Sequence, residues 1–411
     1  CGRILKCFFR RPLKSFRDEV KMKEELKIRF LSDLIDFKNG KSIKPSSGNI
    51  PIYGGNGILG YSEKYNYNNI LIIGRVGAYC GSIHYHKEKC WVSDNAIAGE
   101  VKSDYSIDYL YYLMKSLNLN DRQVGSSQPL LTQGVLNNIS VKIYESSQTQ
   151  QSIAAVLSAL DKKIALNKQI NARLEQMAKT LYDYWFVQFD FPDANGKPYK
   201  SSGGEMVFDE TLKREIPKGW KSGNILNIAN LLGGGTPSKS SPEYWNGNIP
   251  FFTPTDCDNS IFILDTADRI TDAGLCNSST RLFKKHSIFI TARGSVGRSS
   301  INAVPMAMNQ SCYAFQAKEN VSYTFLFFLI RELIMILEVK ATGSVFNSIV
   351  SSDIETTNLV ISNKDLIMKF GEYCEPLFNQ IETNLKQNHQ LTQLRDFLLP
   401  MLMNGQISVA E

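Results

Sequence analysis

The residues best suited to bind an anionic ligand lie in glycine-rich turns that follow short apolar strands. Arg75 stands in GRVGAY and Arg293 in ARGSVGR, in both cases beside small residues. An arginine in such a turn reaches phosphates, or base edges through bidentate hydrogen bonds. Polar and basic loops supply the other candidates for DNA contact: Lys41, Lys44, Tyr53, Asn56, Ser126, Gln128, Thr236, Ser238, Lys239, Ser295 and Arg298. Each residue alone is equally explained as solvated surface, but the set favours DNA over a small substrate.

No combination of side chains predicts catalysis. The chain has no GxSxG, Walker or HExxH motif, and no well-spaced nuclease carboxylates. Asn248–Phe252 (NIPFF) comes closest to an amino-methyltransferase tetrad but lacks the second proline. Gly55, Gly57 and Gly60 match GxGxxG, yet the residues that follow do not begin a helix, as a dinucleotide site requires. We therefore expect no catalytic residues and no cofactor on this chain, and keep a nucleotide-dependent enzyme as a lesser alternative.

Cysteines and histidines do not predict a metal site. The eight cysteines are scattered without a CxxC pair, and the four histidines complete no zinc pattern. His84 and His86 lie on a predicted hairpin, where alternation places both on one face. Free thiols in a reducing cytoplasm are the favoured interpretation.

Composition limits the class of protein further. The net charge of +6 over 411 residues and a pI near 8.7 favour an anionic partner without requiring one. No uncharged apolar run of membrane-spanning length occurs, so we expect no transmembrane helix. Residues 1–24 are dense in lysine and arginine and are predicted to form a flexible basic tail.

Two long helices are predicted to position the candidate residues. Residues 148–186 contain no glycine or proline, and their apolar residues recur at helical spacing. Roughly 40 residues at about 1.5 Å each form a rod about 60 Å long. Residues 366–403 align with this stretch 217 positions later, and Asn167 and Asn171 coincide with Asn384 and Asn388. Coincident polar residues favour a related pair, packed antiparallel or crossing, over two unrelated amphipathic helices.

The globular parts also repeat. Asn248-Ile249-Pro250 echoes Asn49-Ile50-Pro51, 288–297 echoes 71–81, and Asn309 is aligned with Asn95. The predicted order is a basic tail (1–24), an α+β domain (25–145), a central long helix (146–190), a linker (191–215), a second α+β domain (216–363), a C-terminal long helix (364–405) and a tail (406–411). The fold class is α+β, with two globular domains separated by two long helices packed as a coiled-coil pair. Pro400 is predicted to kink or end the second helix.

Together these strings resemble the specificity subunit of type I restriction–modification systems. The resemblance covers about residues 25–407 and rests on IPIYGGNGILGY (50–61), GRVGAYCGSI (74–83), LNKQINARLEQMAKTLYDYWFVQFDFP (166–192), the GGGTPS opening (233–238), ARGSVG (292–297) and LTQLRDFLLPMLMNGQI (391–407).

The resemblance implies a non-catalytic, cytoplasmic subunit whose two target-recognition domains each read half of a bipartite, asymmetric sequence in double-stranded DNA. The helix pair would set the gap between the half-sites. Two modification (methyltransferase) subunits and ATP-driven restriction subunits would be partners, and S-adenosylmethionine, Mg²⁺ and ATP would reside on them. The docking candidates are Leu181, Tyr182, Trp185 and Phe186 with their counterparts Leu398, Leu399, Met401 and Leu402, and interhelix core is an equally good interpretation of them.

The alternative from another class is a coiled-coil interaction scaffold without sequence-specific DNA binding. Salt-dependent and sequence-dependent affinity for DNA separates the two.

Overall fold

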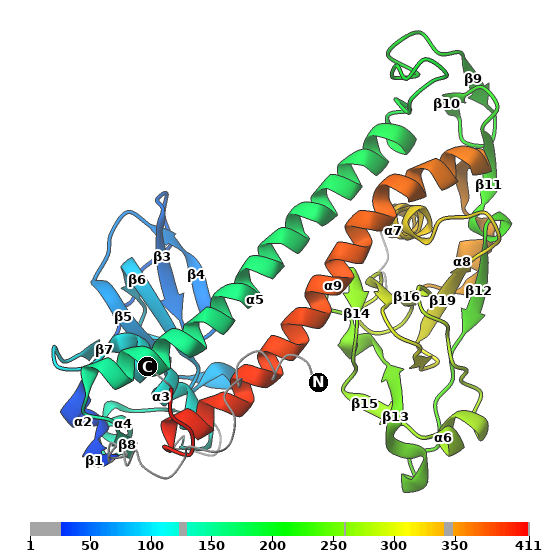
Figure 1. The fold of residues 1–411 in the computed structure, drawn as a ribbon. Helices are drawn as coiled ribbons and strands as arrows, with labels where there is room; N and C mark the ends of the chain where they lie inside the picture. Colours follow the sequence, from blue (N-terminus) through cyan, green and yellow to red (C-terminus); the bar gives the residue numbers. More distant parts are fainter. Residues whose placement is uncertain (1–25, 123–129, 259, 341–347, 410–411) are drawn as a thin grey trace, which may run out of the picture. The chain divides into compact units, whose positions relative to one another are not determined.

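The chain forms two compact units, and each long helix contributes one part to each unit. A computed structural model describes residues 26–122, 130–258, 260–340 and 348–409 (Figure 1). Unit 1 comprises residues 1–162 and 391–411, and unit 2 comprises residues 163–390. Both division points fall inside the long helices.

Unit 1 is built on a sheet. Its described elements are β1 (Lys27–Phe30), α2 (Leu31–Leu34), β2 (Ile35–Asn39), β3 (Ile50–Gly54), β4 (Gly57–Ser62), β5 (Tyr67–Gly74), β6 (Ile83–Val92), β7 (Ala96–Val101), α3 (Ile107–Ser116), α4 (Gln133–Asn137) and β8 (Ser140–Ile143). Six strands pair in the order β2-β7-β5-β6-β3-β4, and β1 pairs with β8. The contacts are antiparallel except for β3 with β6, which is parallel.

The sequence of β5 explains why this strand is central. Its apolar run Ile70–Ile73 is buried on both faces of the sheet. Leu71 and Ile73 pack into the core that α3 and the long helices share, and Ile70 and Ile72 pack on the opposite side. A continuous apolar run is typical of a strand covered on both faces.

We call the globular α+β part of each unit its head. Unit 2 contains the second head and a β-hairpin. Its described strands are β9 (Met206–Asp209), β10 (Arg214–Pro217), β11 (Lys221–Asn224), β12 (Ala229–Gly233), β13 (Trp245–Phe252), β14 (Phe262–Ile263), β15 (Asp268–Ile270), β16 (Ile288–Thr291), β17 (Ser299–Asn302), β18 (Ala307–Met308), β19 (Cys312–Ala317) and β20 (Asn358–Ile361). Its shorter helices are α6 (Asp272–Cys276), α7 (Tyr323–Lys340) and α8 (Ser351–Thr356).

Strand pairing confirms the predicted duplication. In unit 1 β5 lies between β6 and β7, and in unit 2 β16 lies between β17 and β19. The terminal pair β1–β8 corresponds to β11–β20, and both pairs are antiparallel. The parallel contact of β3 with β6 recurs between β13 and β18. Long helices α5 (Ser147–Tyr182) and α9 (Lys364–Met403) follow the two heads.

Buried asparagines show that α5 and α9 run antiparallel. Asn167 donates a hydrogen bond to Asn388 at 2.9 Å, and Asn384 donates one to Asn171 at 2.8 Å. The earlier residue of α5 thus meets the later residue of α9. Asn167 and Asn384 are counterparts in the repeat, as are Asn171 and Asn388, so local two-fold symmetry relates the pairs. We call these four residues the asparagine seam.

Two helix boundaries differ from the sequence expectation. Pro400 lies within α9, which continues to Met403, and the Pro400 carbonyl accepts a hydrogen bond from the Asn404 amide at 2.9 Å. Proline has no N–H to donate, so one hydrogen bond of the helix is missing at this position. Its carbonyl still accepts a hydrogen bond, so the helix continues beyond it. At the other boundary, α5 ends at Tyr182, before a π-helical turn (Asp183–Val187).

The predicted linker is folded rather than irregular. Asp190 accepts hydrogen bonds from the Ser201 amide at 2.7 Å and hydroxyl at 2.6 Å. The hydroxyl and amide of Ser201 keep the pKa of Asp190 below its usual value. The ring of Phe191 stacks between Tyr199 and Trp220, and β9 pairs with β10 beyond it. These contacts join residues distant in sequence, so periodicity does not reveal them.

A buried carboxylate anchors the head of unit 2 to α9. Glu382 accepts hydrogen bonds from Lys386 of the same helix at 2.5 Å and from Lys285 of the head at 2.8 Å. His286 lies 3.4 Å from the same carboxylate and stacks on Tyr323 with ring centroids 4.1 Å apart. Burial lowers the pKa of His286. Burial alone would raise the pKa of Glu382, but the two lysines outweigh it and lower that pKa.

Replacing Asn388 with alanine is expected to destabilise the protein by about 1–3 kcal/mol, because the Asn167 amide stays buried without this partner. Urea-induced unfolding of the full chain measures this change. Asn379→Ala, at an exposed position of the same helix, is the matched control. Replacing Asn167 and Asn388 together with leucine should restore most of the loss. Equal urea midpoints for Asn388→Ala and the control would contradict this prediction.

Acid is expected to weaken unit 2 in two steps. The pKa of His286 is lowered in the folded chain, so the unfolded chain binds the proton first and stability falls as pH drops below about 6.5. The pKa of Glu382 is also lowered, so its contribution is lost below about pH 4.5. Urea midpoints between pH 7 and 5.5 test the first step, and His286→Asn should flatten the slope. A wild-type midpoint that is constant over this range would refute the prediction.

Candidate nucleic-acid interface

Three segments of unit 2 meet at one end of its sheet. They are residues 233–239 after β12, residues 292–298 between β16 and β17, and residues 309–311 between β18 and β19. The Gly235 amide donates to the Met308 carbonyl and the Arg293 amide to the Ser311 carbonyl, both at 3.0 Å. We call this the unit 2 rim. Its backbone holds polar side chains on exposed turns.

Unit 1 has an equivalent rim, formed by residues 40–44, 75–79 and 93–95. The Lys41 amide donates to the Val92 carbonyl and the Arg75 amide to the Asn95 carbonyl, both at 3.0 Å. A Cβ atom on Gly40 would lie 2.0 Å from the Ser93 carbonyl oxygen, and one on Gly234 would lie 2.2 Å from that of Asn309. Both rims therefore require a glycine at the same point, where two backbones approach closely.

Hydrogen bonds fix the correspondence between the rims and correct the sequence alignment. The Ser93 amide donates to the Tyr53 carbonyl, as the Asn309 amide donates to that of Phe252. Asn309 thus corresponds to Ser93, two positions from the predicted Asn95. Similarly, the Leu131 amide bonds the Arg75 carbonyl, and the Ile349 amide bonds that of Ala292.

Arg75 therefore corresponds to Ala292, and Arg293 corresponds to Val76. This agrees with the one-position offset that the isolated bridges Val76–Leu130 and Arg293–Ser348 show. From the sequence, the two arginines align only approximately, one or two positions apart. The hydrogen bonds set this offset at one position. Because the offset reverses the direction of a side chain on extended backbone, Arg75 is half-buried while Arg293 is exposed.

The structure brings most predicted residues of unit 1 to one end of its sheet. Lys41 and Arg75 belong to the unit 1 rim. The Tyr53 carbonyl accepts a hydrogen bond from the Ser93 amide of this rim. The Tyr53 hydroxyl makes a hydrogen bond of 3.2 Å to His86 Nδ1. Arg75 Nε is buried without a partner among the described residues. Lys44 is an exposed residue of the same rim, Asn56 is exposed on the turn between β3 and β4, and Ser126 and Gln128 lie outside the described residues.

In unit 2 all predicted contact residues lie on the rim. Thr236, Ser238 and Lys239 follow β12, and Ser295 shares the β16–β17 turn with Arg293. The Thr236 hydroxyl donates a hydrogen bond to the side-chain oxygen of Gln310. The Arg298 side chain is held in place, because its Nη1 donates a hydrogen bond to the Cys257 carbonyl at 3.0 Å. Sequence reasoning missed Gln310 and its counterpart Asp94, which the corrected repeat alignment reveals.

The glycine motif does not form a nucleotide site. Gly55 lies in the two-residue turn between β3 and β4, and Gly57 and Gly60 lie in β4. A dinucleotide site needs the glycines between a strand and a helix whose N-terminus binds the phosphates. The hairpin therefore excludes the nucleotide-binding interpretation of this motif, which was the basis of the enzyme alternative.

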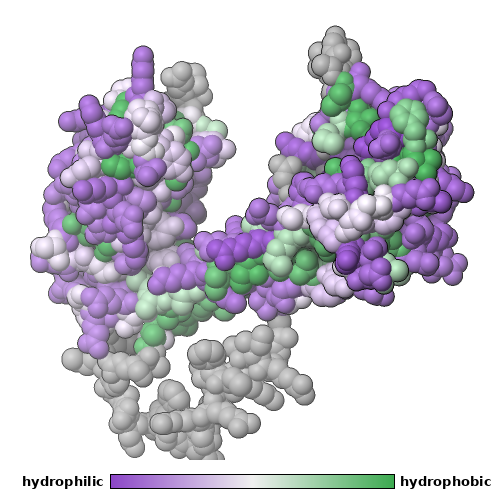
Figure 2. All heavy atoms as spheres, turned by 90° about the horizontal axis from the view of Figure 1, so that it is seen from above, coloured by the Kyte–Doolittle hydropathy of each residue, from purple (hydrophilic) through white to green (hydrophobic). Residues whose placement is uncertain are grey.

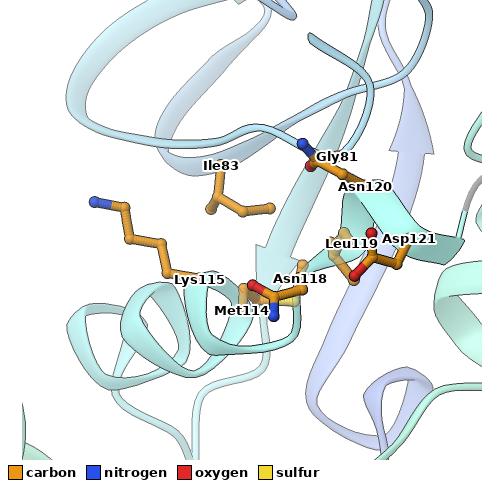
Figure 3. Close-up of a pocket in the computed structure, with 8 residues that line it drawn as sticks. All are labelled: Gly81, Ile83, Met114, Lys115, Asn118, Leu119, Asn120 and Asp121. Atoms are coloured by element: carbon orange, nitrogen blue, oxygen red, sulfur yellow. The ribbon is translucent and has the colours of Figure 1, made fainter. Parts of the chain in front are cut away.

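A separate hollow of about 320 Å³ opens beside the turn that follows β5. Figure 3 shows Gly81 close to Asn120, with the amine of Lys115 pointing away from the other lining residues. A Cβ atom on Gly81, which has a φ of 84°, would lie 2.6 Å from the Asn120 amide nitrogen. The glycine is thus explained by close packing. The remaining lining residues are Ile83, Met114, Asn118, Leu119 and Asp121.

The predicted docking residues divide into two groups. Trp185 and Phe186 are each 5% exposed and pack on Phe370 of α9, which places them in the core of unit 2, as the alternative interpretation of these residues expects. Tyr182 and Leu402 are likewise buried, the latter in unit 1. Leu181, Leu398, Leu399 and Met401 are half-buried.

Cysteine and membrane predictions concern only the residues that the structure describes. Within them no group of three or more metal-binding side chains comes together. Cys80, Cys90, Cys312 and Cys374 are buried free thiols, and burial raises the pKa of Cys90 to about 12. In the described ranges, no helix combines the length and the apolar character needed to cross a bilayer.

Known proteins are similar to this chain in sequence and in fold. The model of the type I restriction modification DNA specificity domain matches residues 23–176 and 217–393. The chain is 30% identical over 312 residues to the type I restriction enzyme MjaIX specificity subunit of Methanocaldococcus jannaschii, which covers 74% of this chain and 70% of that protein. Identity to the HindI specificity subunit of Haemophilus influenzae is 26% over 330 residues, covering 68% and 71%.

A crystal structure of the type I restriction–modification S subunit from M. genitalium has the same fold. Its TM-score is 0.63 at 15% identity, and the match covers 94% of this chain and 98% of that chain. Two α+β heads with equivalent rims, each followed by a long helix, define an internally duplicated fold. The chain belongs to the family of type I restriction–modification DNA specificity subunits, whose role is recognition of the DNA target and not catalysis.

Alanine at Gly234 is expected to damage the unit 2 rim, because its methyl group would overlap the Asn309 carbonyl oxygen. The cost is about 1–3 kcal/mol of stability, with weaker DNA binding. Gly233 is the matched control, since no atom outside its own chain neighbours lies within 4 Å of a Cβ placed there. Urea unfolding and binding to a random DNA duplex measure both effects. If Gly233→Ala and Gly234→Ala behave alike, the close approach does not shape the rim.

Proposed function

We propose that each unit reads one half of a bipartite, asymmetric DNA sequence and that α5 and α9 set the gap between the halves. The observation that carries the proposal is the pair of equivalent rims, whose backbones agree while their side chains differ. Lys41 corresponds to Gly235, and Arg75 corresponds to Ala292. Identical rims would favour a symmetric target, so different side chains favour two unlike half-sites.

The rims have the chemistry that DNA requires. Lys41 and Arg75 in unit 1, and Lys239 and Arg293 in unit 2, are cations on turns at the end of a sheet. Cations neutralise phosphates and release counterions, and polar side chains between them contact base edges. The loops rather than the sheet core would carry the sequence preference.

We also propose that two methyltransferase subunits and ATP-driven restriction subunits assemble with this chain in the cytoplasm. Exposed apolar side chains on the helices support docking: Leu166 is 50% exposed, Met177 58%, Leu394 45% and Phe397 62%. Figure 2 shows hydrophobic side chains (green) exposed among hydrophilic ones (purple) on this face of the molecule. S-adenosylmethionine, Mg²⁺ and ATP would be bound by these partner subunits.

The test of the proposed function is a map of methylated adenines in the host genome with and without this gene. Loss of one bipartite motif with a fixed gap is the expected result. Equilibrium binding of the full chain to duplex DNA at several salt concentrations separates reader from scaffold, because phosphate contacts make affinity salt-dependent. Intact methylation together with no sequence preference in binding would favour the scaffold.

A matched insertion of seven residues into both helices is expected to lengthen the gap and leave the half-site sequences unchanged. The insertions follow Ile164 in α5 and Gln390 in α9, so the asparagine seam stays paired. Seven residues add about 10 Å of helix, equivalent to about three base pairs. The map of methylated adenines measures the new gap.

The control places the same seven residues in the exposed turn at Asn195–Gly196, outside both helices. That variant should keep the original gap. An unchanged gap in the helix variant, with methylation retained, would show that the helices are not the ruler.

A further inference from the structure

One exposed side chain occupies the tip of an equivalent turn in each rim. It is Gln310 in unit 2 and Asp94 in unit 1. In both turns the preceding side chain accepts a hydrogen bond from the amide that follows the tip: Asn309 from Ser311 at 3.0 Å, and Ser93 from Asn95 at 3.4 Å. The two tips therefore have the same backbone support and different chemistry.

Gln310 is held in place although it is exposed. The Thr236 hydroxyl donates to Gln310 Oε1, and Thr236 follows Gly235, whose amide is bonded to Met308. This bond uses one lone pair of the amide oxygen and leaves the second lone pair and both Nε2 hydrogens available. A side chain oriented before binding loses less conformational freedom when it contacts a ligand.

We propose that Gln310 and Asp94 are specificity-determining residues that read base edges in the major groove, one in each half-site, and that Thr236 positions Gln310. The proposal rests on the proposed function of the two rims. A glutamine with a free acceptor and donor matches N6 and N7 of adenine, and an aspartate accepts from N4 of cytosine.

Charge supports this assignment for Asp94. The unit 1 rim carries Lys41 and Arg75, which attract phosphates, whereas an exposed carboxylate beside them repels phosphates. Base edges offer amino donors that a carboxylate accepts, so Asp94 suits a base contact better than a backbone contact. The difference between Gln310 and Asp94 also makes the two half-sites unlike.

The experiment uses the full chain assembled with its methyltransferase subunits and a library of random DNA duplexes, whose bound fraction is sequenced. Gln310→Ala should lose preference at one base pair of one half-site by about 5-fold to 150-fold. Gln310→Glu should shift that preference from adenine to cytosine. Thr236→Val should weaken the same preference, and Thr236→Ser should retain it. Asp94→Ala should affect only the other half-site.

Gln169→Ala, an exposed glutamine on α5, is the matched control and should leave both half-sites unchanged. Thermal unfolding confirms that each variant is folded. Retained binding with unaltered preferences in Gln310→Ala, Gln310→Glu and Asp94→Ala would overturn the inference and leave the proposed function standing. A wild-type complex that selects no bipartite sequence would refute the proposed function, and the inference would fall with it.

Discussion

The asparagine seam is the interaction on which the arrangement of the long helices depends. Apolar helix faces tolerate sliding by whole turns, because one leucine contact replaces another. Hydrogen bonds of Asn167 to Asn388 and of Asn384 to Asn171 exist at only one register. Asn167 Oδ1 remains buried without a partner in the described chain, which costs stability. The seam thus contributes register rather than stability, and the register determines the length of helix between the asparagines and each head.

The heads are attached to the helices by carboxylate networks that differ between the units: Asp161 is partly exposed, and Glu382 is buried. In unit 1 Asp161 of α5 accepts hydrogen bonds from Tyr112 of α3 and Arg395 of α9, each at 2.8 Å. In unit 2 Glu382 of α9 binds Lys285 and the stacked His286. A carboxylate that is shielded from water is stable only when its hydrogen-bond partners are in place. Each network therefore fixes the head of its unit on the helix. The duplicated folds therefore use separate attachments, which can be altered one at a time.

Sequence periodicity predicted the elements that local patterns encode. The long helices, the apolar run of β5 and the duplication follow from spacing and repetition. Contacts between distant residues were not accessible in this way. The stacking of Phe191 on Trp220 orders a stretch without periodicity, and the burial of Trp185 depends on α9. The sequence aligned the two arginines only to within one or two positions, because the turn between β5 and β6 (75–82) is one residue longer than the turn between β16 and β17 (292–298). Backbone hydrogen bonds resolve the offset to one position.

The two rims separate what must stay constant from what is free to differ. Gly40 and Gly234 occupy the same point because any side chain there would overlap a carbonyl oxygen. The turns that present Asp94 and Gln310 are fixed by the residues on either side, through bonds that do not involve the tip side chain. Exchange of a tip residue therefore leaves the fold of its unit intact. Because each rim lies within its own unit, the proposed function implies that one half of a target can change without altering recognition of the other.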